Sequence, residues 1–219
     1  MELKDAVLQR HSVRAYDGRA LTPEDEAALR QAVDDCNREN GLHFQLFTDE
    51  PEAFQANKPS YGSFSGCRNY LALVAPKDQD EKIGYYGEKL VLLAQTLGVN
   101  SCWVALTYQK KAVKVEIAPG EKLHMVISLG YGVTQGSPRK SKTAAEVSDM
   151  TESSPAWYKN GIKAALLAPT AINQQKFRFT LDGDKVTAKA GLGFYAKVDL
   201  GIVKYHFELG AEKGHDVWA

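Results

Sequence analysis

Residues 69–76, Asn-Tyr-Leu-Ala-Leu-Val-Ala-Pro, are apolar at nearly every position. A short apolar run of this kind is typical of a strand buried on both faces. The next segment, residues 80–97, has apolar residues at helical spacing and ends at a glycine; these residues are Leu90, Leu93, Ala94, Leu97 and Gly98. A buried strand that leads straight into a long helix restricts the chain to folds in which helices cover a sheet.

Helix and strand signals alternate along the rest of the chain. Thr22 can cap a helix whose first position is Pro23, and Gly41 ends that helix. Helices are predicted over residues 2–10, 23–40, 80–97, 155–168 and 197–211, and strands over residues 42–46, 69–76, 101–106, 124–129, 177–181 and 185–189. This alternation predicts an α+β (or α/β) core.

The length of 219 residues fits one large domain, or two half-domains that share a core. Residues 26–47 and residues 157–181 each read as a helix followed by an alternating strand. The two units are either related halves, 1–135 and 150–219, or two examples of a common motif, and the second interpretation is favoured. The polar segment 134–153 is the best candidate for a boundary.

Composition restricts the partners and the compartment. Lys plus Arg and Asp plus Glu both count 27, so a general attraction to nucleic acid or to an anionic membrane is not expected. No apolar run approaches the roughly 20 residues that span a bilayer, and residues 1–5 lack the apolar core of a signal peptide. The cysteines, Cys36, Cys67 and Cys102, have no metal-ligand spacing. We expect a cytoplasmic protein without a bound metal.

Arg10-His11-Ser12-Val13-Arg14 is the first candidate binding segment. If the segment is extended, the side chains of Arg10, Ser12 and Arg14 point the same way. Two guanidinium groups and a hydroxyl would then face one anion, and the planar guanidinium suits a phosphate. The simpler alternative places both arginines at the C-terminus of a helix, where its dipole favours cations. The motif alone favours that alternative.

Three other segments carry groups that can bind a ligand. Residues 168–175 hold Thr170, Asn173 and Gln175, whose donors and acceptors can match the edge of a flavin pyrimidine ring. Residues 103–106 end a predicted strand and could border a planar ligand, although a core strand is the commoner case. Residues 137–142 carry cations that either add to a phosphate site or are solvated. For residues 168–175 the simpler alternative is a helix end with solvated amides.

These segments together resemble the FMN-dependent nitroreductases. Residues 10–16 resemble the family's Arg-x-Ser-x-Arg-x-(Phe/Tyr) signature, and residues 168–175 resemble its Ala-Pro-Ser-x-x-Asn-x-Gln segment. Residues 97–103 are similar to its Leu-Gly-Leu-Gly-x-Cys-Trp stretch, and residues 130–142 to its Gly-Tyr-Pro and basic segment. The resemblance implies a nitroreductase-like fold over residues 1–219, with a central mixed sheet flanked by helices.

The resemblance also implies a set of cofactor-binding residues. Arg10, Ser12 and Arg14, with His11 beside them, would hold the FMN phosphate and ribityl region, and Arg139 and Lys142 would complete the phosphate pocket. Thr170, Asn173 and Gln175 would meet the flavin ring or the ribityl hydroxyls, and Trp103, Val104, Ala105 and Leu106 would border the ring. NADH or NADPH would reduce the flavin, which would then reduce a nitroaromatic, a quinone or a similar small molecule by a ping-pong mechanism. Such a flavoprotein is expected to be a homodimer.

Two departures from the family pattern bear on the site. The Asn-x-Gln motif comes late in the chain, as in a sub-branch of the family, and this leaves open whether one chain or a dimer builds the flavin site. Lys176-Phe177 replaces the usual Pro-Trp, so the wall of the substrate pocket is expected to differ.

The cofactor carries the chemistry in such enzymes, so no side chain is assigned a catalytic role. The chain has no Gly-x-Gly-x-x-Gly fingerprint for a Rossmann nicotinamide site. Two alternatives remain open: a flavin-binding sensor or carrier without turnover, and a flavin reductase or dehalogenase-like relative. The natural electron acceptor and the choice between NADH and NADPH also remain open.

Overall fold

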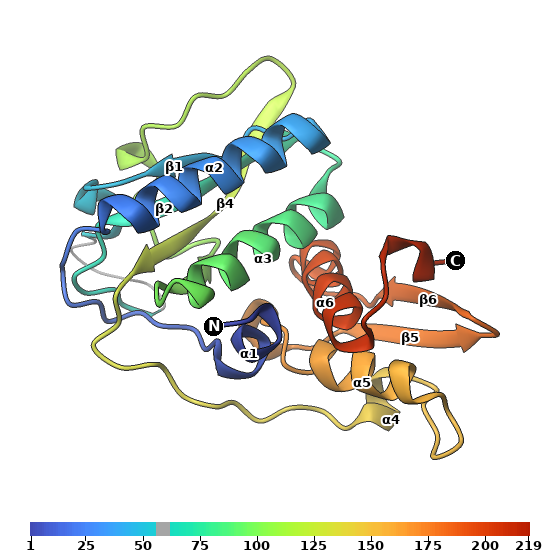
Figure 1. The fold of residues 1–219 in the computed structure, drawn as a ribbon. Helices are drawn as coiled ribbons and strands as arrows, with labels where there is room; N and C mark the ends of the chain where they lie inside the picture. Colours follow the sequence, from blue (N-terminus) through green and yellow to red (C-terminus); the bar gives the residue numbers. More distant parts are fainter. Residues whose placement is uncertain (56–61) are drawn as a thin grey trace. The chain divides into compact units, whose positions relative to one another are not determined.

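The structure, a computed structural model, describes residues 1–55 and 62–219 and has the α+β class predicted from the sequence (Figure 1). The α-helices are α1 (Leu3–Gln9), α2 (Pro23–Asn40), α3 (Asp80–Thr96), α4 (Ala144–Val147), α5 (Ala156–Ala165) and α6 (Ala196–Ala211). The strands are β1 (Gln45–Phe47), β2 (Asn69–Pro76), β3 (Asn100–Val104), β4 (Glu121–Gly130), β5 (Phe177–Asp182) and β6 (Lys185–Ala190).

The chain separates into two compact units. The first unit contains residue 1 and residues 9–79 and 90–138, and the second contains residues 2–8, 80–89 and 139–219. The helix α3 therefore contributes its first part to the second unit and its last part to the first. None of the helices in the described part of the chain combines the length and apolarity that crossing a membrane requires.

A four-stranded sheet in the order β1-β2-β4-β3 forms the centre of the first unit. Its ladders are antiparallel, with Tyr70 opposite Ser128 and Cys102 also opposite Ser128. A mixed sheet was expected, but the ladders between its strands are all antiparallel. Parallel pairing with this sheet is found only as isolated bridges among the described residues, such as Ser12 with Ser101. Strand β2 is almost wholly buried, as its apolar sequence predicts.

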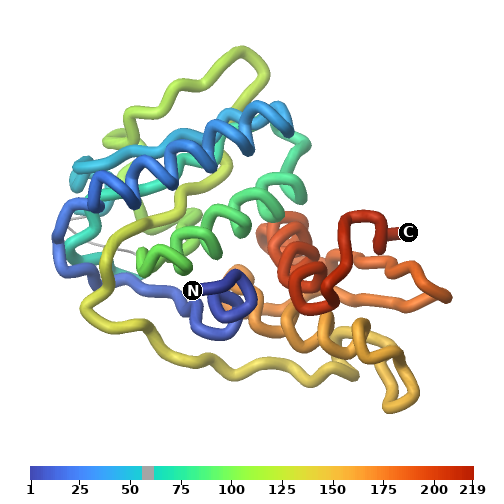
Figure 2. The backbone as a smooth tube through the Cα atoms, viewed as in Figure 1, coloured from blue at the N-terminus to red at the C-terminus, as the bar shows by residue number. Residues whose placement is uncertain are grey.

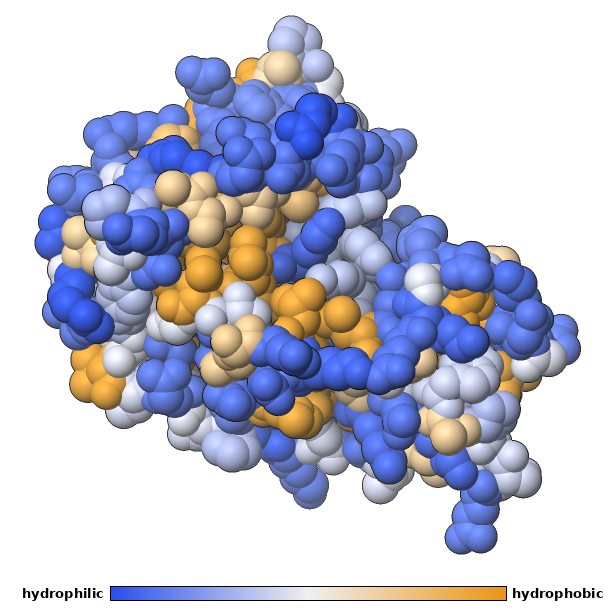
Figure 3. All heavy atoms as spheres, in the orientation of Figure 1, coloured by the Kyte–Doolittle hydropathy of each residue, from blue (hydrophilic) through white to orange (hydrophobic). Residues whose placement is uncertain are grey.

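Capping residues set the ends of α2 as predicted. The Thr22 hydroxyl accepts a hydrogen bond from the Asp25 amide at 3.1 Å. At the other end, Gly41 adopts a left-handed conformation with φ of 61°, and its N–H donates to the Asn37 carbonyl. The buried face of α2 carries Leu29, Val33 and Cys36. Figure 3 shows mainly hydrophilic side chains over its outer face.

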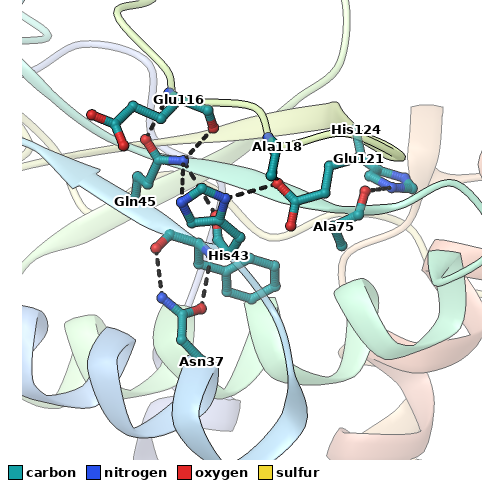
Figure 4. A network of polar contacts seen from close by, with 9 residues as sticks. Asn37, His43, Gln45, Ala75, Glu116, Ala118, Glu121 and His124 are labelled. Carbon is teal, nitrogen blue, oxygen red and sulfur yellow. Dashed lines mark hydrogen bonds and ion pairs between the residues drawn. The ribbon is translucent and has the colours of Figure 1, made fainter.

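Strand β1 is shorter than the predicted strand over residues 42–46. The Asn37 side chain binds both backbone groups of Phe44, each at 2.8 Å, so these groups cannot join the sheet (Figure 4). In the same network, Gln45 binds the backbone N–H and carbonyl of Glu116 at 2.9 and 2.7 Å. These side chains fix β1 and the loop before β4, which is yellow-green in Figure 2.

The core of the second unit is rich in aromatic rings. Phe179 of β5 stacks on Phe207 of α6, with ring centroids 5.1 Å apart. Gly161 of α5 lies directly against Phe207, where an added Cβ would be 2.5 Å from the ring. A buried pair, Glu88 and His206, joins α3 to α6 at 2.8 Å. The predicted helices and the hairpin of this unit are confirmed, whereas α4 was not predicted.

Candidate functional site

The segment from Arg10 to Arg14 is extended, as the site prediction requires. It follows α1 and runs beside β3, where the Val13 amide donates to the Ser101 carbonyl at 3.0 Å. Val13 is buried, Ser12 is half-buried and Arg14 is exposed. Arg10 has only 3% of its surface exposed. The three predicted phosphate ligands therefore differ in exposure, and Arg14 is the one most open to solvent.

The Cys102 thiol of β3 is a common neighbour of the three predicted phosphate-binding side chains. Burial raises the pKa of this thiol, whereas Arg14, a hydrogen bond with Ser12 and the charge of Arg10 all lower its pKa. Ser12 is therefore hydrogen-bonded to the thiol, and the positive charges of Arg14 and Arg10 act on it. Two guanidinium groups and a hydroxyl form a donor set that suits a phosphate.

A buried tyrosine fixes this segment to the sheet. The Tyr16 hydroxyl lies 2.7 Å from the Val13 carbonyl and 2.7 Å from the Ser128 hydroxyl. Ser128 in turn donates to the Cys102 carbonyl at 3.3 Å. Burial raises the pKa of Tyr16 well above its usual value, so the phenol stays protonated and able to donate. The site prediction omitted Tyr16 and Ser128, although Tyr16 ends the quoted motif.

His11 is held by local contacts. Its Nδ1 lies 2.9 Å from the Gln9 carbonyl, and Gly136, with φ of 78°, packs so closely that an added Cβ would lie 2.6 Å from the His11 Cβ. The loop that carries Gly136 therefore covers one side of the Arg10–Arg14 segment. A larger residue at position 136 would displace this contact.

The predicted ring-bordering residues span the end of β3. Trp103 is half-buried and Val104 is buried, but the predicted strand over residues 101–106 is too long. After Val104 the chain turns away from the sheet, and the Gln109 amide donates to the Ala53 carbonyl at 2.8 Å. Leu106 is consequently 66% exposed. The structure places Trp103 and Val104 in the strand, and Ala105 and Leu106 beyond its end.

In the second unit, the segment from Thr170 to Gln175 has a strained backbone. Ile172, Asn173 and Gln175 have φ of 46°, 55° and 45°, which is the left-handed region. This conformation is uncommon for residues other than glycine and is an outlier for a β-branched isoleucine. Such strain persists only where neighbouring contacts hold it, and it is often found at functional sites.

Gln175 and Lys142 brace this segment. Gln175 is 1% exposed; its Oε1 accepts from the Lys142 amide at 2.7 Å, and its Nε2 donates to the Leu166 carbonyl at 3.0 Å. The Lys142 ammonium donates to the Gln175 carbonyl at 3.0 Å, and the Thr170 hydroxyl accepts from the Gln175 amide at 3.1 Å. The backbone and side-chain polar atoms of Gln175 are therefore hydrogen-bonded to residues of the second unit.

Arg139 and Asn173 belong to the same cluster. The Arg139 Nε donates to the Asn173 Oδ1 at 2.8 Å, and the Asn173 Nδ2 donates to the Lys140 carbonyl at 2.8 Å. Arg139 also donates to the Ala168 carbonyl, just beyond α5. A cation at the C-terminus of a helix is favoured by the helix dipole. The structure thus brings together Arg139, Lys142, Thr170, Asn173 and Gln175 in one hydrogen-bonded group.

Asp199 of α6 anchors the strained segment. Its carboxylate accepts from the Ala171 amide at 3.0 Å and from the Gln174 Nε2 at 2.7 Å. Burial raises the pKa of Asp199 to about 6, although both hydrogen bonds oppose this rise. The site prediction omitted Asp199. A carboxylate within the mostly apolar helix predicted over residues 197–211, which also holds Glu208, was the available signal.

Replacing Asp199 by asparagine should remove a pH dependence of stability. Because the pKa of Asp199 in the folded protein, about 6, exceeds its usual value of 3.8, the folded state keeps a proton that the unfolded state has lost. Stability therefore falls as the pH rises from about 4 to about 6. Relative to the wild type, Asp199→Asn should gain up to about 3 kcal/mol across this window. The free energy of unfolding of both proteins is measured by urea denaturation at several pH values. A difference between the two proteins that stays the same at every pH would contradict this assignment.

No metal centre is evident within residues 1–55 and 62–219, where no group of three or more His, Cys, Asp or Glu side chains is placed to hold a metal ion.

Comparisons with known proteins identify the family. The family model described as "Putative TM nitroreductase" matches residues 2–211. A structure from Thermotoga maritima, named a nitroreductase, has 22% identity and a TM-score of 0.68, over 96% of this chain and 83% of that chain. A nitroreductase structure from Desulfovibrio desulfuricans in complex with FMN has 19% identity and a TM-score of 0.54, over 71% and 99% of the two chains.

A third structure, from Bacteroides thetaiotaomicron, is named an NADH dehydrogenase/NAD(P)H nitroreductase and has 16% identity and a TM-score of 0.52, over 66% and 95% of the two chains. At these identities the likeness shows the fold. No curated protein matches the chain. Because the family model covers almost the whole sequence, the chain belongs to the nitroreductase family, a family of oxidoreductases.

Proposed function

We propose that the protein binds FMN and that Arg10, Ser12 and Arg14 hold its phosphate and ribityl region. The observation that carries the proposal is the pairing of the Arg10–Arg14 segment with β3, through the Ser12–Ser101 bridge and the Val13–Ser101 hydrogen bond. His11 lies beside them. The FMN complex of the Desulfovibrio desulfuricans structure supports the choice of cofactor. The residues at the end of β3, Trp103, Val104, Ala105 and Leu106, are proposed to border the flavin ring.

For the second unit, we propose that the segment from Thr170 to Gln175 presents its polar groups to a flavin. Thr170 and Asn173 are at least partly exposed, so they can reach a ring edge or ribityl hydroxyls. Gln175 is buried and acts by supporting the segment. Arg139 and Lys142 are proposed to bind phosphate, and each would exchange a backbone carbonyl for it.

We propose an oxidoreductase that takes hydride from NADH or NADPH and reduces a nitroaromatic, a quinone or a similar acceptor by a ping-pong mechanism. Bound FMN supplies the redox chemistry. The residues of this chain bind and orient the cofactor, and none is assigned as an acid or base. The family supports the oxidoreductase class, and the name of the Bacteroides thetaiotaomicron structure supports the nicotinamide donor. We further propose a cytoplasmic homodimer built from single nitroreductase-like domains.

Initial rates test this function. Protein reconstituted with FMN should oxidise NADPH or NADH in the presence of the quinone menadione. Double-reciprocal plots at several menadione concentrations should be parallel, because donor and acceptor visit in turn. Intersecting lines would contradict the ping-pong order. Stoichiometric FMN without any turnover would instead indicate a flavin-binding sensor or carrier.

A further inference from the structure

Three large apolar side chains in the second unit are strongly exposed and lie beside the strained segment. Ile172, Leu192 and Phe194 are 76%, 94% and 82% exposed. We call these three residues the apolar rim. Leaving such side chains in water forgoes the stabilisation that burial would give, so a group of them commonly marks a binding surface.

Contacts around Gln174 bring the parts of the apolar rim together. The Gln174 Nε2 donates to the Phe194 carbonyl at 2.8 Å and to Asp199 at 2.7 Å. Gly193 lies so close to the Gln174 side chain that an added Cβ would collide with its Oε1. The loop that carries Leu192 and Phe194 is therefore held against the segment that carries Ile172.

The backbone holds these side chains outward. Ile172 has φ of 46°, and Tyr195, which follows Phe194, has φ of 58°. Asp199 binds the Ala171 amide on one side of Ile172, and its own amide donates to the Tyr195 carbonyl at 2.9 Å. One residue of α6 thus binds the backbone next to Ile172 and at Tyr195, which follows Phe194.

We propose that the apolar rim binds the flat, apolar face of the electron acceptor, a planar quinone or nitroaromatic. This inference rests on the proposed oxidoreductase function. The apolar rim adjoins Thr170 and Asn173, which are proposed to meet the flavin. Three side chains provide much less than the roughly 800 Å² per partner of a stable protein interface, but they match the size of one aromatic ring system.

A cation accompanies the apolar rim. The aliphatic part of Lys176 lies along the same loop, with its Cδ 3.0 Å from the position of an added Gly193 Cβ. Lys176 itself is exposed. An ammonium beside an apolar surface suits an acceptor that combines a flat ring with electron-rich oxygen atoms, as quinones and nitroaromatics do.

Competing acceptors test the apolar rim. Menadione is flat and apolar, whereas ferricyanide is compact, highly charged and has no apolar face. Phe194→Ala should lower the ratio of kcat/KM for menadione to kcat/KM for ferricyanide about tenfold, mainly through the KM for menadione. Phe194→Tyr keeps the ring and should retain the wild-type ratio. Ile117→Ala, at an exposed isoleucine of the first unit, serves as the matched control and should not change the ratio.

The outcomes separate the two proposals. A wild-type protein that reduces both acceptors, with the same ratio in Phe194→Ala, would overturn the role of the apolar rim alone. A wild-type protein that reduces neither acceptor would overturn the oxidoreductase function and this role with it. A variant that changes the oligomeric state in sedimentation and leaves the ratio unchanged would identify the apolar rim as a contact between copies and overturn the proposal.

Discussion

Arg14→Ala should weaken FMN binding by about 100-fold, because a guanidinium–phosphate contact is a charge-assisted hydrogen bond between two full charges. Arg14 is exposed, so its removal leaves no buried group without a partner and the fold should persist. Ser12→Ala should have a smaller effect, about tenfold, since a neutral hydroxyl is a weaker donor to phosphate. Fluorescence titration of the apoprotein with FMN gives both dissociation constants.

Arg19→Ala provides the matched control for Arg14. Arg19 is also an exposed arginine of the first unit, and its Nε is paired with Asp17 at 2.7 Å. Its removal changes the net charge equally and should leave FMN affinity unchanged. Equal losses of affinity in both variants would show that general charge attracts the phosphate, and an unchanged affinity in Arg14→Ala would exclude Arg14 as a ligand.

Gly201→Ala should destabilise the second unit by about 3 kcal/mol or more, because overpacking against backbone cannot be relieved by a side-chain rotation. Helix α6 passes the first part of α3 at two glycines. A Cβ at Gly201 would collide with the Glu81 carbonyl, and a Cβ at Gly84 would collide with the Val198 carbonyl. Because α6 also carries Asp199, the strained segment should loosen as well.

The measurement for Gly201→Ala is the midpoint of thermal unfolding, which should fall by roughly 10 °C. Gly214→Ala is the control, since an added Cβ there would meet only the Asp216 carboxylate, at 2.9 Å, and φ is −83°. That variant should unfold within a few degrees of the wild type. A midpoint for Gly201→Ala as high as that of Gly214→Ala would contradict the close helix crossing.

Local sequence signals predicted the regular elements well where the deciding contacts are close in the chain. Thr22, Pro23 and Gly41 set the ends of α2 through contacts within a few residues. The apolar run of β2 is buried on both faces, so its composition is sufficient to identify it. Strand β1 was predicted too long because the clamp of Asn37 on Phe44 depends on the packing of a helix.

The candidate site was less predictable because its shape depends on distant residues. Left-handed backbone at Ile172 runs against the preference of a β-branched residue and is held by Asp199, many positions later in the chain. Nothing local to Gln175 shows that its amide is buried and bound to Lys142. The alternation of cation, hydroxyl and cation at Arg10, Ser12 and Arg14 was compatible with an extended segment. The motif alone favoured a helix end, so the pairing of this segment with β3 could not be settled from the sequence.

The visible absorption spectrum of the purified protein, recorded before and after NADPH or NADH is added without oxygen, tests the central proposal most directly. The account predicts the bands of oxidised flavin, with about one FMN per chain, and their bleaching when the donor is added. Flavin bands that persist with both donors would contradict the oxidoreductase function and leave a flavin-binding protein. A colourless protein that takes up no added FMN would contradict the assignment of the flavin site itself.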